Sequence, residues 1–234
     1  MHLFPRLLGI VCFLPLLNGG TVAQTITLDE GEFRLTVAGR EVGSETFTIR
    51  QNGTGMNAII IAQGRVNAAP TEGAQELSAS LEVAGATLRP IAYQVAVQGA
   101  QQERIAGRVV GGRFSARIFS PAGEMMREYL ASEGAVLLDE GVAHHYYFLA
   151  RRLADGRVRV PLIVPRQSRQ VTASVTEQGS ETVTVAGQRV EGRRLVVQIE
   201  GSAERHVWVD AQGRVLRLEI PARNYSAERK ALPG

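Results

Sequence analysis

The feature that most constrains this chain is an alternation of apolar and polar residues, which recurs in strand-length runs from Phe33 to Ile220. Glycine interrupts these runs about every 8–13 residues, a spacing typical of an all-β sandwich or barrel. In the run Phe33-Arg34-Leu35-Thr36-Val37, every second residue is apolar. A period of two predicts one buried face and one wet face, as in antiparallel sheets.

About ten to twelve such runs can be counted, which is too many for one open sheet to stay flat. We therefore predict a mainly β fold in which a long, curved antiparallel sheet forms a half-barrel or an open barrel. Val-Ala-Gly turns at residues 37–39, 83–85 and 185–187 support hairpins between successive strands. Glycine suits these turns because it adopts the positive φ that tight hairpins need.

One segment breaks this pattern, because its apolar residues recur at helical spacing. We predict a central α-helix over about residues 140–153 that covers the sheet, with Asp139 as its N-cap and Asp155-Gly156 as its stop. The apolar stripe consists of Val142, Tyr146, Leu149 and Leu153. The polar side consists of His144, Tyr147 and Arg151. Core packing explains the stripe; the alternative is a lid or plug over a cavity, because Tyr147 and Phe148 need apolar partners.

The first 23 residues are predicted to be a secretory signal peptide. A positively charged start precedes the apolar stretch Leu7–Leu17, and Thr21 and Ala23 are the small residues before a cleavage point near Gln24. About eleven apolar residues are too few to span a bilayer, which favours a cleaved signal peptide. The alternative is an uncleaved membrane anchor. We expect residues 24–234 to form a single, soluble, β-rich domain that is exported to the periplasm or the extracellular space. The single cysteine, Cys12, precedes this domain, so no disulfide is expected in it.

The net charge is +3, and nearly every basic residue is an arginine. Six arginines follow the predicted helix, at positions 151, 152, 157, 159, 166 and 169. No aromatic residues interleave with them, so nucleic-acid binding is not expected. A weak attraction to acidic lipid head groups remains. We predict at most a peripheral membrane contact through Arg151, Arg152, Arg157 and Arg159.

No catalytic, metal or cofactor site is predicted. The adjacent residues His144 and His145 would point about 100° apart on a helix and could not easily share one tetrahedral ion. No Gly-x-Ser-x-Gly elbow presents a serine nucleophile. Asp139 and Glu140 are neighbours at a helix start and could not flank a glycosidic bond. A hydrolase with an unrecognised site is therefore the least favoured class.

Two hairpin-forming segments carry a resemblance. They are residues 185–195, Val-Ala-Gly-Gln-Arg-Val-Glu-Gly-Arg-Arg-Leu, and residues 206–220, which begin His-Val-Trp-Val-Asp. With the order of strands and helix, the chain resembles a family of uncharacterised exported bacterial proteins whose curved half-barrel is like that of bacterial lipoprotein carriers. The resemblance implies a concave apolar surface able to hold acyl chains, and it transfers no functional residue.

The leading hypothesis is a non-catalytic exported binding protein that holds a lipid or an acylated peptide between sheet and helix. The residues expected to contact this ligand are Tyr93, Val95, Tyr146, Leu149, Val197 and Trp208. Trp208 is out of phase with Val207 and Val209, so it is either a ligand-stacking residue or a cross-strand packing partner. The alternative is a structural or interaction protein of the cell envelope with a filled core. Expected partners are a lipid, a lipoprotein or an envelope protein.

Overall fold

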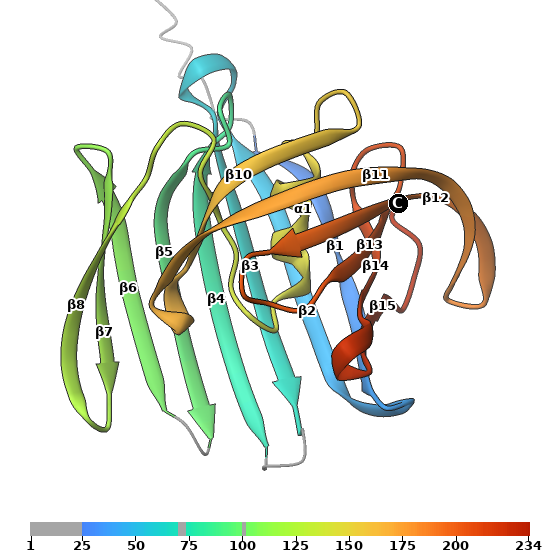
Figure 1. Cartoon of the computed structure of the whole chain (residues 1–234), viewed down its shortest axis with the longest axis horizontal. Coiled ribbons are helices and arrows are strands. Elements are labelled where there is room, and N and C mark those ends of the chain that lie inside the picture. The colour runs from blue at the N-terminus through green and yellow to red at the C-terminus, as the bar shows by residue number, and fades with distance from the viewer. Residues whose placement is uncertain (1–24, 70–73, 100–101) are drawn as a thin grey trace, which may run out of the picture.

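A computed structural model of the chain describes residues 25–69, 74–99 and 102–234, so the predicted signal peptide lies outside the described residues. Fifteen strands of the described residues form one continuous sheet (Figure 1). The first eight are β1 Thr25–Val37, β2 Arg40–Asn52, β3 Ile59–Ala68, β4 Gln75–Ala84, β5 Pro90–Gly99, β6 Glu103–Val110, β7 Arg113–Ser120 and β8 Gly123–Leu130. The others are β9 Val136–Leu137, β10 Arg157–Val164, β11 Arg169–Val185, β12 Gln188–Ile199, β13 Arg205–Val209, β14 Val215–Ile220 and β15 Tyr225–Arg229.

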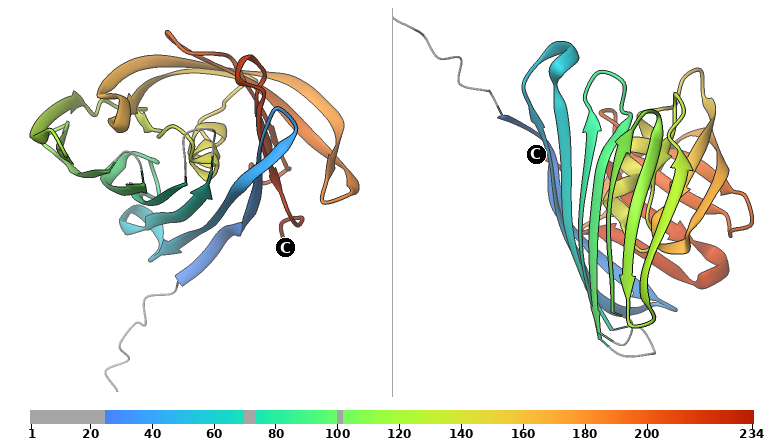
Figure 2. Two further views of the ribbon diagram at one scale, coloured as in Figure 1. Left: turned by 90° about the horizontal axis from the view of Figure 1, so that it is seen from below. Right: turned by 90° about the vertical axis from the view of Figure 1, so that its left-hand side faces the viewer.

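The sheet consists of two meanders that meet at its middle. Strands β1–β8 form the first wing and β9–β15 form the second, and the antiparallel pair β1–β15 joins them with Leu35 opposite Ala227. Seen from one end, the two wings curl toward each other around the helix (Figure 2). Strands β8 and β9 are the two outer edges. All pairs are antiparallel except β9–β10, because the chain between these two strands crosses back over the sheet through residues 138–156 instead of turning in a hairpin.

The prediction of a curved, mainly antiparallel sheet is confirmed, but the expected number of strands was too low. Two of the strands lack the alternation by which strands are counted. Strand β8 buries only Tyr129 among its eight residues, and β9 is two residues long. Long strands also bend through irregular positions, as β11 does between Glu177 and Ser180.

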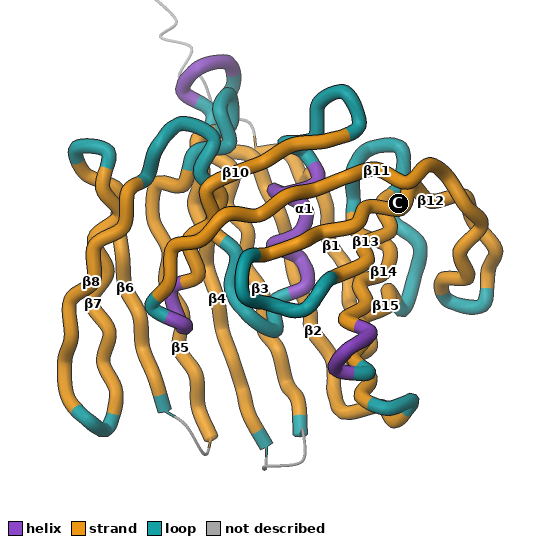
Figure 3. The backbone as a smooth tube through the Cα atoms, viewed as in Figure 1, coloured by secondary structure: helices purple, strands orange, loops and turns teal. Residues whose placement is uncertain are grey.

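The helix is shorter than predicted and lies on the concave side of the curved sheet (Figure 3). A 3₁₀ turn, Ala143–His145, leads directly into α1, Tyr146–Ala150. The predicted polar side is wrong, since His144 and Tyr147 are both buried. A helix enclosed between two wings has apolar surroundings on all sides, so it needs no polar face. Three further 3₁₀ turns occupy Gly55–Asn57, Pro165–Gln167 and Pro221–Arg223.

The predicted N-cap is also wrong. Asp139 lies four residues before the first 3₁₀ turn, and Gly141, with φ of +75°, separates the two. The Oδ1 atom of Asp139 accepts the backbone N–H of its neighbour Glu140 at 2.9 Å. The side chain therefore stabilises the loop before the turn rather than the helix end.

The interior is filled by residues 138–153, here called the plug segment. Apolar side chains of the plug segment and of both wings form one buried cluster. Its members include Phe33, Leu81 and Tyr93 from the first wing, Leu162, Val175 and Val207 from the second, and Leu138, Phe148 and Leu149 from the plug segment. Burying one such side chain contributes about 1.5–3 kcal/mol. The plug segment is therefore an integral part of the core.

Candidate functional site

Five of the six residues predicted to contact an apolar ligand lie in this interior cluster. Tyr93 is 0% exposed, and Leu149 and Val197 are each 1% exposed. Val95 and Tyr146 are buried almost as completely. These side chains are covered by their neighbours, and the plug segment lies where the acyl chain was expected.

Trp208 lies apart from the other five. It belongs to a second cluster with Val183, Val185 and Leu216, on the other side of the sheet from the plug segment. Its indole Nε1–H donates to Oε1 of Glu181 at 2.5 Å. Guanidinium groups of Arg194 and Arg217 lie 5.8 and 5.6 Å from the ring centroid. These contacts place Trp208 as a cross-strand packing partner.

A buried carboxylate anchors the plug segment to the first wing. Glu45 of β2 accepts the backbone N–H groups of Ala143 at 2.7 Å and of His144 at 3.0 Å. Its Oε1 atom also lies 2.6 Å from Nδ1 of His144, and both side chains are 0% exposed. One carboxylate thus satisfies two backbone donors at the start of the 3₁₀ turn together with the ring beside them.

Gly64 of β3 leaves space for the His144 ring because glycine has no side chain. A Cβ atom at Gly64 of β3 would lie 2.5 Å from Cε1 of His144. Phe47 of β2 lies directly opposite Gly64, and its ring is nearly parallel to the imidazole of His144, with centroids 5.5 Å apart. Gly64 and Phe47 therefore fix where the imidazole sits.

A second polar contact links the plug segment to β5. The hydroxyl of Tyr93 donates to Oδ2 of Asp139 at 2.5 Å. The backbone N–H of Asp139 donates to Nδ1 of His145 at 3.2 Å. Burial raises the pKa of Asp139 to about 6, although Arg166 and the Tyr93 hydroxyl oppose this shift. Burial lowers the pKa of His145 well below its ordinary value, and the neighbouring His144 lowers it further.

These interior groups hold the plug segment rather than face a cleft. The Nε2 atoms of His144 and His145 are buried and have no hydrogen-bond partner among the residues that the structure describes. In the described part of the chain, no group of three or more His, Cys, Asp or Glu residues is arranged to hold a metal ion. Chemically, the arrangement supplies directional contacts between plug and sheet, which a purely apolar interface lacks.

The predicted arginine group is divided by the fold. The Arg151 side chain lies against Tyr147, 5.2 Å from the ring centroid, and donates to the carbonyl of Gln212. Arg152 is partly buried, which lowers its pKa. Arg157 and Arg159 are exposed on β10, and Arg151 is exposed at the end of α1. In the described residues, no helix is both long and apolar enough to cross a bilayer.

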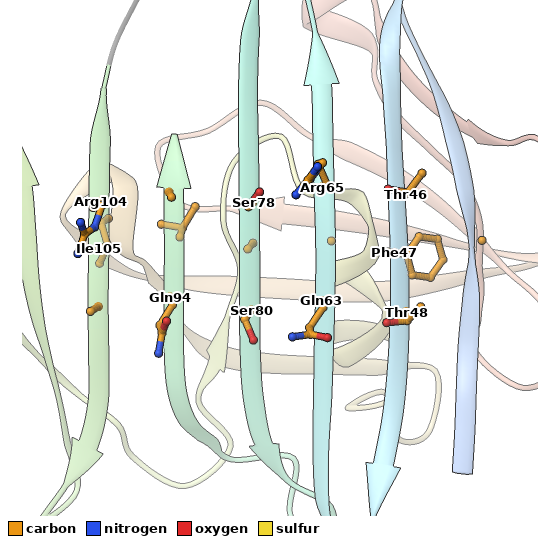
Figure 4. A pocket seen from close by; sticks show the side chains of 16 residues that line it. Thr46, Phe47, Thr48, Gln63, Arg65, Ser78, Ser80, Gln94, Arg104 and Ile105 are labelled. Atoms are coloured by element: carbon orange, nitrogen blue, oxygen red, sulfur yellow. The ribbon is translucent and has the colours of Figure 1, made fainter. Parts of the chain in front are cut away.

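The outer face of the first wing carries a hollow of about 600 Å³ that is lined by both polar and apolar residues (Figure 4). Each of β2–β6 contributes three consecutive residues to it. The outer two side chains face the hollow, and the middle residue, such as Ala79 of β4, points toward the core. We call this feature the outer trough.

Strand register arranges the trough side chains in two rows. The first row is Thr46, Arg65, Ser78, Ala96 and Arg104. The second row is Thr48, Gln63, Ser80, Gln94 and Ala106. Both rows run across the strands, so the trough crosses the sheet rather than following one strand.

Two signals of these features were present in the sequence. Glu45 shares the phase of Phe47 and Ile49, which are apolar, so an alternating strand places a carboxylate on the buried face. Ser80 is a short side chain between Gln63 and Gln94 on the neighbouring strands, which lowers the trough floor. The partner of Glu45 could not be identified in this way, because it lies far away in the chain.

The fold and the sealed interior define a curved, single-sheet half-barrel that encloses its own plug. No protein-family model matches the chain, and no curated protein matches its sequence. Among solved structures, it is similar to a beta-barrel-like protein of the domain of unknown function DUF1849 from Brucella abortus. The two share 9% identity with a TM-score of 0.50, and the match covers 88% of this chain and 97% of that one. This likeness concerns the fold alone.

Proposed function

We propose that the chain is an exported, non-catalytic interaction protein of the bacterial cell envelope, whose binding surface lies on the outside of a filled half-barrel. The observation that carries this proposal is the plug segment. It occupies the concave side of the sheet, where ligands of curved sheets bind. The surfaces left for a partner are the outer faces of the wings and the sheet edges.

The polar groups of the interior support the same conclusion. Glu45 is engaged by Ala143 and His144, and Asp139 is engaged by Tyr93 and Glu140. All four side chains in these contacts are sealed from solvent. A catalytic acid or base must reach a substrate atom at about 3 Å, either directly or through a water. These groups are instead used to position the plug segment.

The resemblance to lipoprotein carriers favours a different function, in which a lipid or acylated peptide lies between sheet and helix. Such a ligand would have to displace the plug segment. Displacement would break the contacts of Glu45 with Ala143 and His144 and would expose Tyr146 and Leu149. Because each large apolar side chain contributes about 1.5–3 kcal/mol on burial, exchanging the plug for a ligand is costly. We therefore favour the interaction function.

Membrane contact, in this proposal, is at most peripheral. Arg157 and Arg159 are exposed on β10 and can approach acidic head groups. Arg151 and Arg152 are held at the end of α1 by backbone carbonyls of Gln212 and Ala135.

The test is native mass spectrometry of the secreted protein, combined with titration of a fluorescent fatty acid. We expect a mature chain that begins near Gln24, has the mass of the free polypeptide and takes up no fatty acid. The Leu149→Ala variant, titrated with benzene, shows that the interior was filled, because removing this side chain opens a dry cavity large enough for so small an apolar probe. Stoichiometric co-purifying lipid, or uptake of fatty acid by the wild type, would contradict the interaction function and support the carrier.

A further inference from the structure

The outer trough continues beyond β6 into a second hollow. This second hollow, of about 520 Å³, shares Ala96 and Arg104 with the first and ends at Phe119, Ser120 and Pro121. Register explains the continuity, because Phe119 of β7 lies directly opposite Arg104 of β6 and extends the first row. Arg117 extends the second row in the same way, opposite Ala106. The combined trough crosses six strands, from β2 to β7.

The polar side chains along the two rows of the trough favour a hydroxyl-bearing ligand over an acyl chain. Its side chains carry hydroxyls at Thr46, Thr48, Ser78 and Ser80 and amides at Gln63 and Gln94. Hydroxyls and amides both donate and accept hydrogen bonds, so they match a ligand whose surface is covered with hydroxyl groups. An apolar ligand would bury these groups without partners, which costs free energy.

Arg104 is the unpaired charge at one end of the trough, because Glu103, which also lines the second hollow, lies 3.6 Å from Arg166. Arg104 makes no ion pair within 4 Å among the described residues; its guanidinium lies 5.8 Å from the centroid of the Phe119 ring. Arg65 is 3.4 Å from Glu76, and both side chains are solvent-exposed, so the attraction between them is weak. A guanidinium without a carboxylate partner can take a carboxylate from a ligand in a bidentate contact.

Phe119 completes the chemistry of the site. Its side chain is 37% exposed beside Arg104, at the end of the trough. An exposed ring offers an apolar platform next to polar groups, which suits a ligand with C–H faces and hydroxyl edges.

We propose that the outer trough binds an acidic polysaccharide that lies across strands β2–β7, with a sugar carboxylate on Arg104 and a sugar face on Phe119. The proposal deepens the interaction function and rests on it. Recognition is by hydroxyl and amide side chains along the two rows. A nucleic acid is disfavoured because a single exposed aromatic ring in the trough cannot stack successive bases.

The probe is a short oligomer of galacturonic acid, titrated calorimetrically into the secreted protein. We expect binding that weakens with added salt, because the carboxylate contact is electrostatic. A neutral glucose oligomer of similar length is expected to bind at least about tenfold more weakly, because charged hydrogen bonds are the stronger ones. Equal binding of the two oligomers, or no binding of the acidic one, would overturn the proposal.

Two variants on the same strand test the assignment of Arg104. Arg104→Gln should reduce affinity for the acidic oligomer about tenfold or more. Arg108→Gln makes the same charge change on β6 outside the trough and should alter affinity less than about twofold. Ser80→Tyr should abolish binding by filling the trough floor. Equal effects of the two arginine variants, or equal binding of a polyglutamate peptide, would show a non-specific charge effect and overturn the proposal.

Failure here can be separated from failure of the proposed function. If the oligomer does not bind while the secreted protein is free of lipid, the interaction function stands and the polysaccharide assignment falls. If lipid co-purifies, the interaction function falls whatever the oligomer does.

Discussion

The Oε1 atom of Glu45 lies 2.6 Å from Nδ1 of His144, and this contact joins β2 to the plug segment across 99 positions of the chain. The same carboxylate accepts two backbone N–H groups, from Ala143 and His144. A single side chain therefore fixes where the plug segment enters the sheet. Because all three contacts are buried, their loss cannot be compensated by water.

Glu45→Gln should therefore destabilise the protein strongly. An amide has the same shape as the carboxylate but turns one acceptor into a donor, which must face a backbone N–H or the His144 ring. We expect a loss of about 2–4 kcal/mol, measured by urea denaturation. Glu41→Gln is the control, because its contact with Arg34 is about half exposed and should cost less than about 0.5 kcal/mol. Equal losses for the two variants would contradict the anchoring role of Glu45.

The pKa of Asp139 predicts a defined pH dependence of stability. Burial raises this pKa from 3.8 to about 6, so the folded state favours the protonated carboxyl. The resulting stabilisation is fully present below about pH 4 and is lost as the pH rises through about 6. Asp139→Asn removes this titration. We expect the variant to gain about 3 kcal/mol relative to the wild type between about pH 4 and pH 7.

Urea denaturation of both proteins across this pH range measures the difference. Comparing the two removes the opposite contribution of His145, whose lowered pKa acts in each of them. A difference in free energy of unfolding that does not change with pH would show that Asp139 titrates normally.

The parts of the fold that could be predicted from the sequence are those encoded by residues close together in the chain. The alternation of Phe33, Leu35 and Val37 with polar residues is a property of five consecutive positions, so it predicts a half-buried strand without knowledge of the rest. Strand β8 has no such pattern, because at the edge of the sheet only Tyr129 reaches the core. An edge strand of this kind is therefore hard to recognise from the sequence.

The helix and the site depend on long-range contacts that a local pattern does not contain. His144 and Tyr147 were placed on a wet face because a helix on the outside of a sheet needs one. Enclosure between two wings, which buries both residues, is decided by how the sheet curls. In the same way, Glu45 can be identified as a buried carboxylate from its phase with Phe47, but its partner cannot. The outer trough needs the register of five strands, which single runs do not specify.

Gly64→Ala tests whether the His144 ring occupies its position because glycine leaves room for it. The added Cβ atom would lie 2.5 Å from Cε1 of the ring, so the imidazole or β3 must shift. We expect a loss of about 1–3 kcal/mol in the free energy of unfolding. In a His144→Ala background the same change should cost much less, because the ring is absent. Additive effects in this double-mutant cycle would mean that the two residues do not compete for space.

The amide of Gln170 closes part of the free edge of the sheet. Its Nε2 donates to the carbonyl of Leu130 at 2.7 Å, and its Oε1 accepts the N–H of Leu130 at 2.9 Å. A side chain of β11 thus pairs with the end of β8 as a neighbouring strand would.

Gln170→Ala should speed amide hydrogen exchange at Leu130 and along β8, since edge segments open locally without global unfolding. Global stability should change by less than about 1 kcal/mol, because the contact is exposed. Gln94→Ala, in the outer trough, should leave exchange in β8 unchanged. Unaltered exchange at Leu130 in the Gln170→Ala variant would show that the Gln170 amide does not protect β8, and that packing alone holds this strand in place.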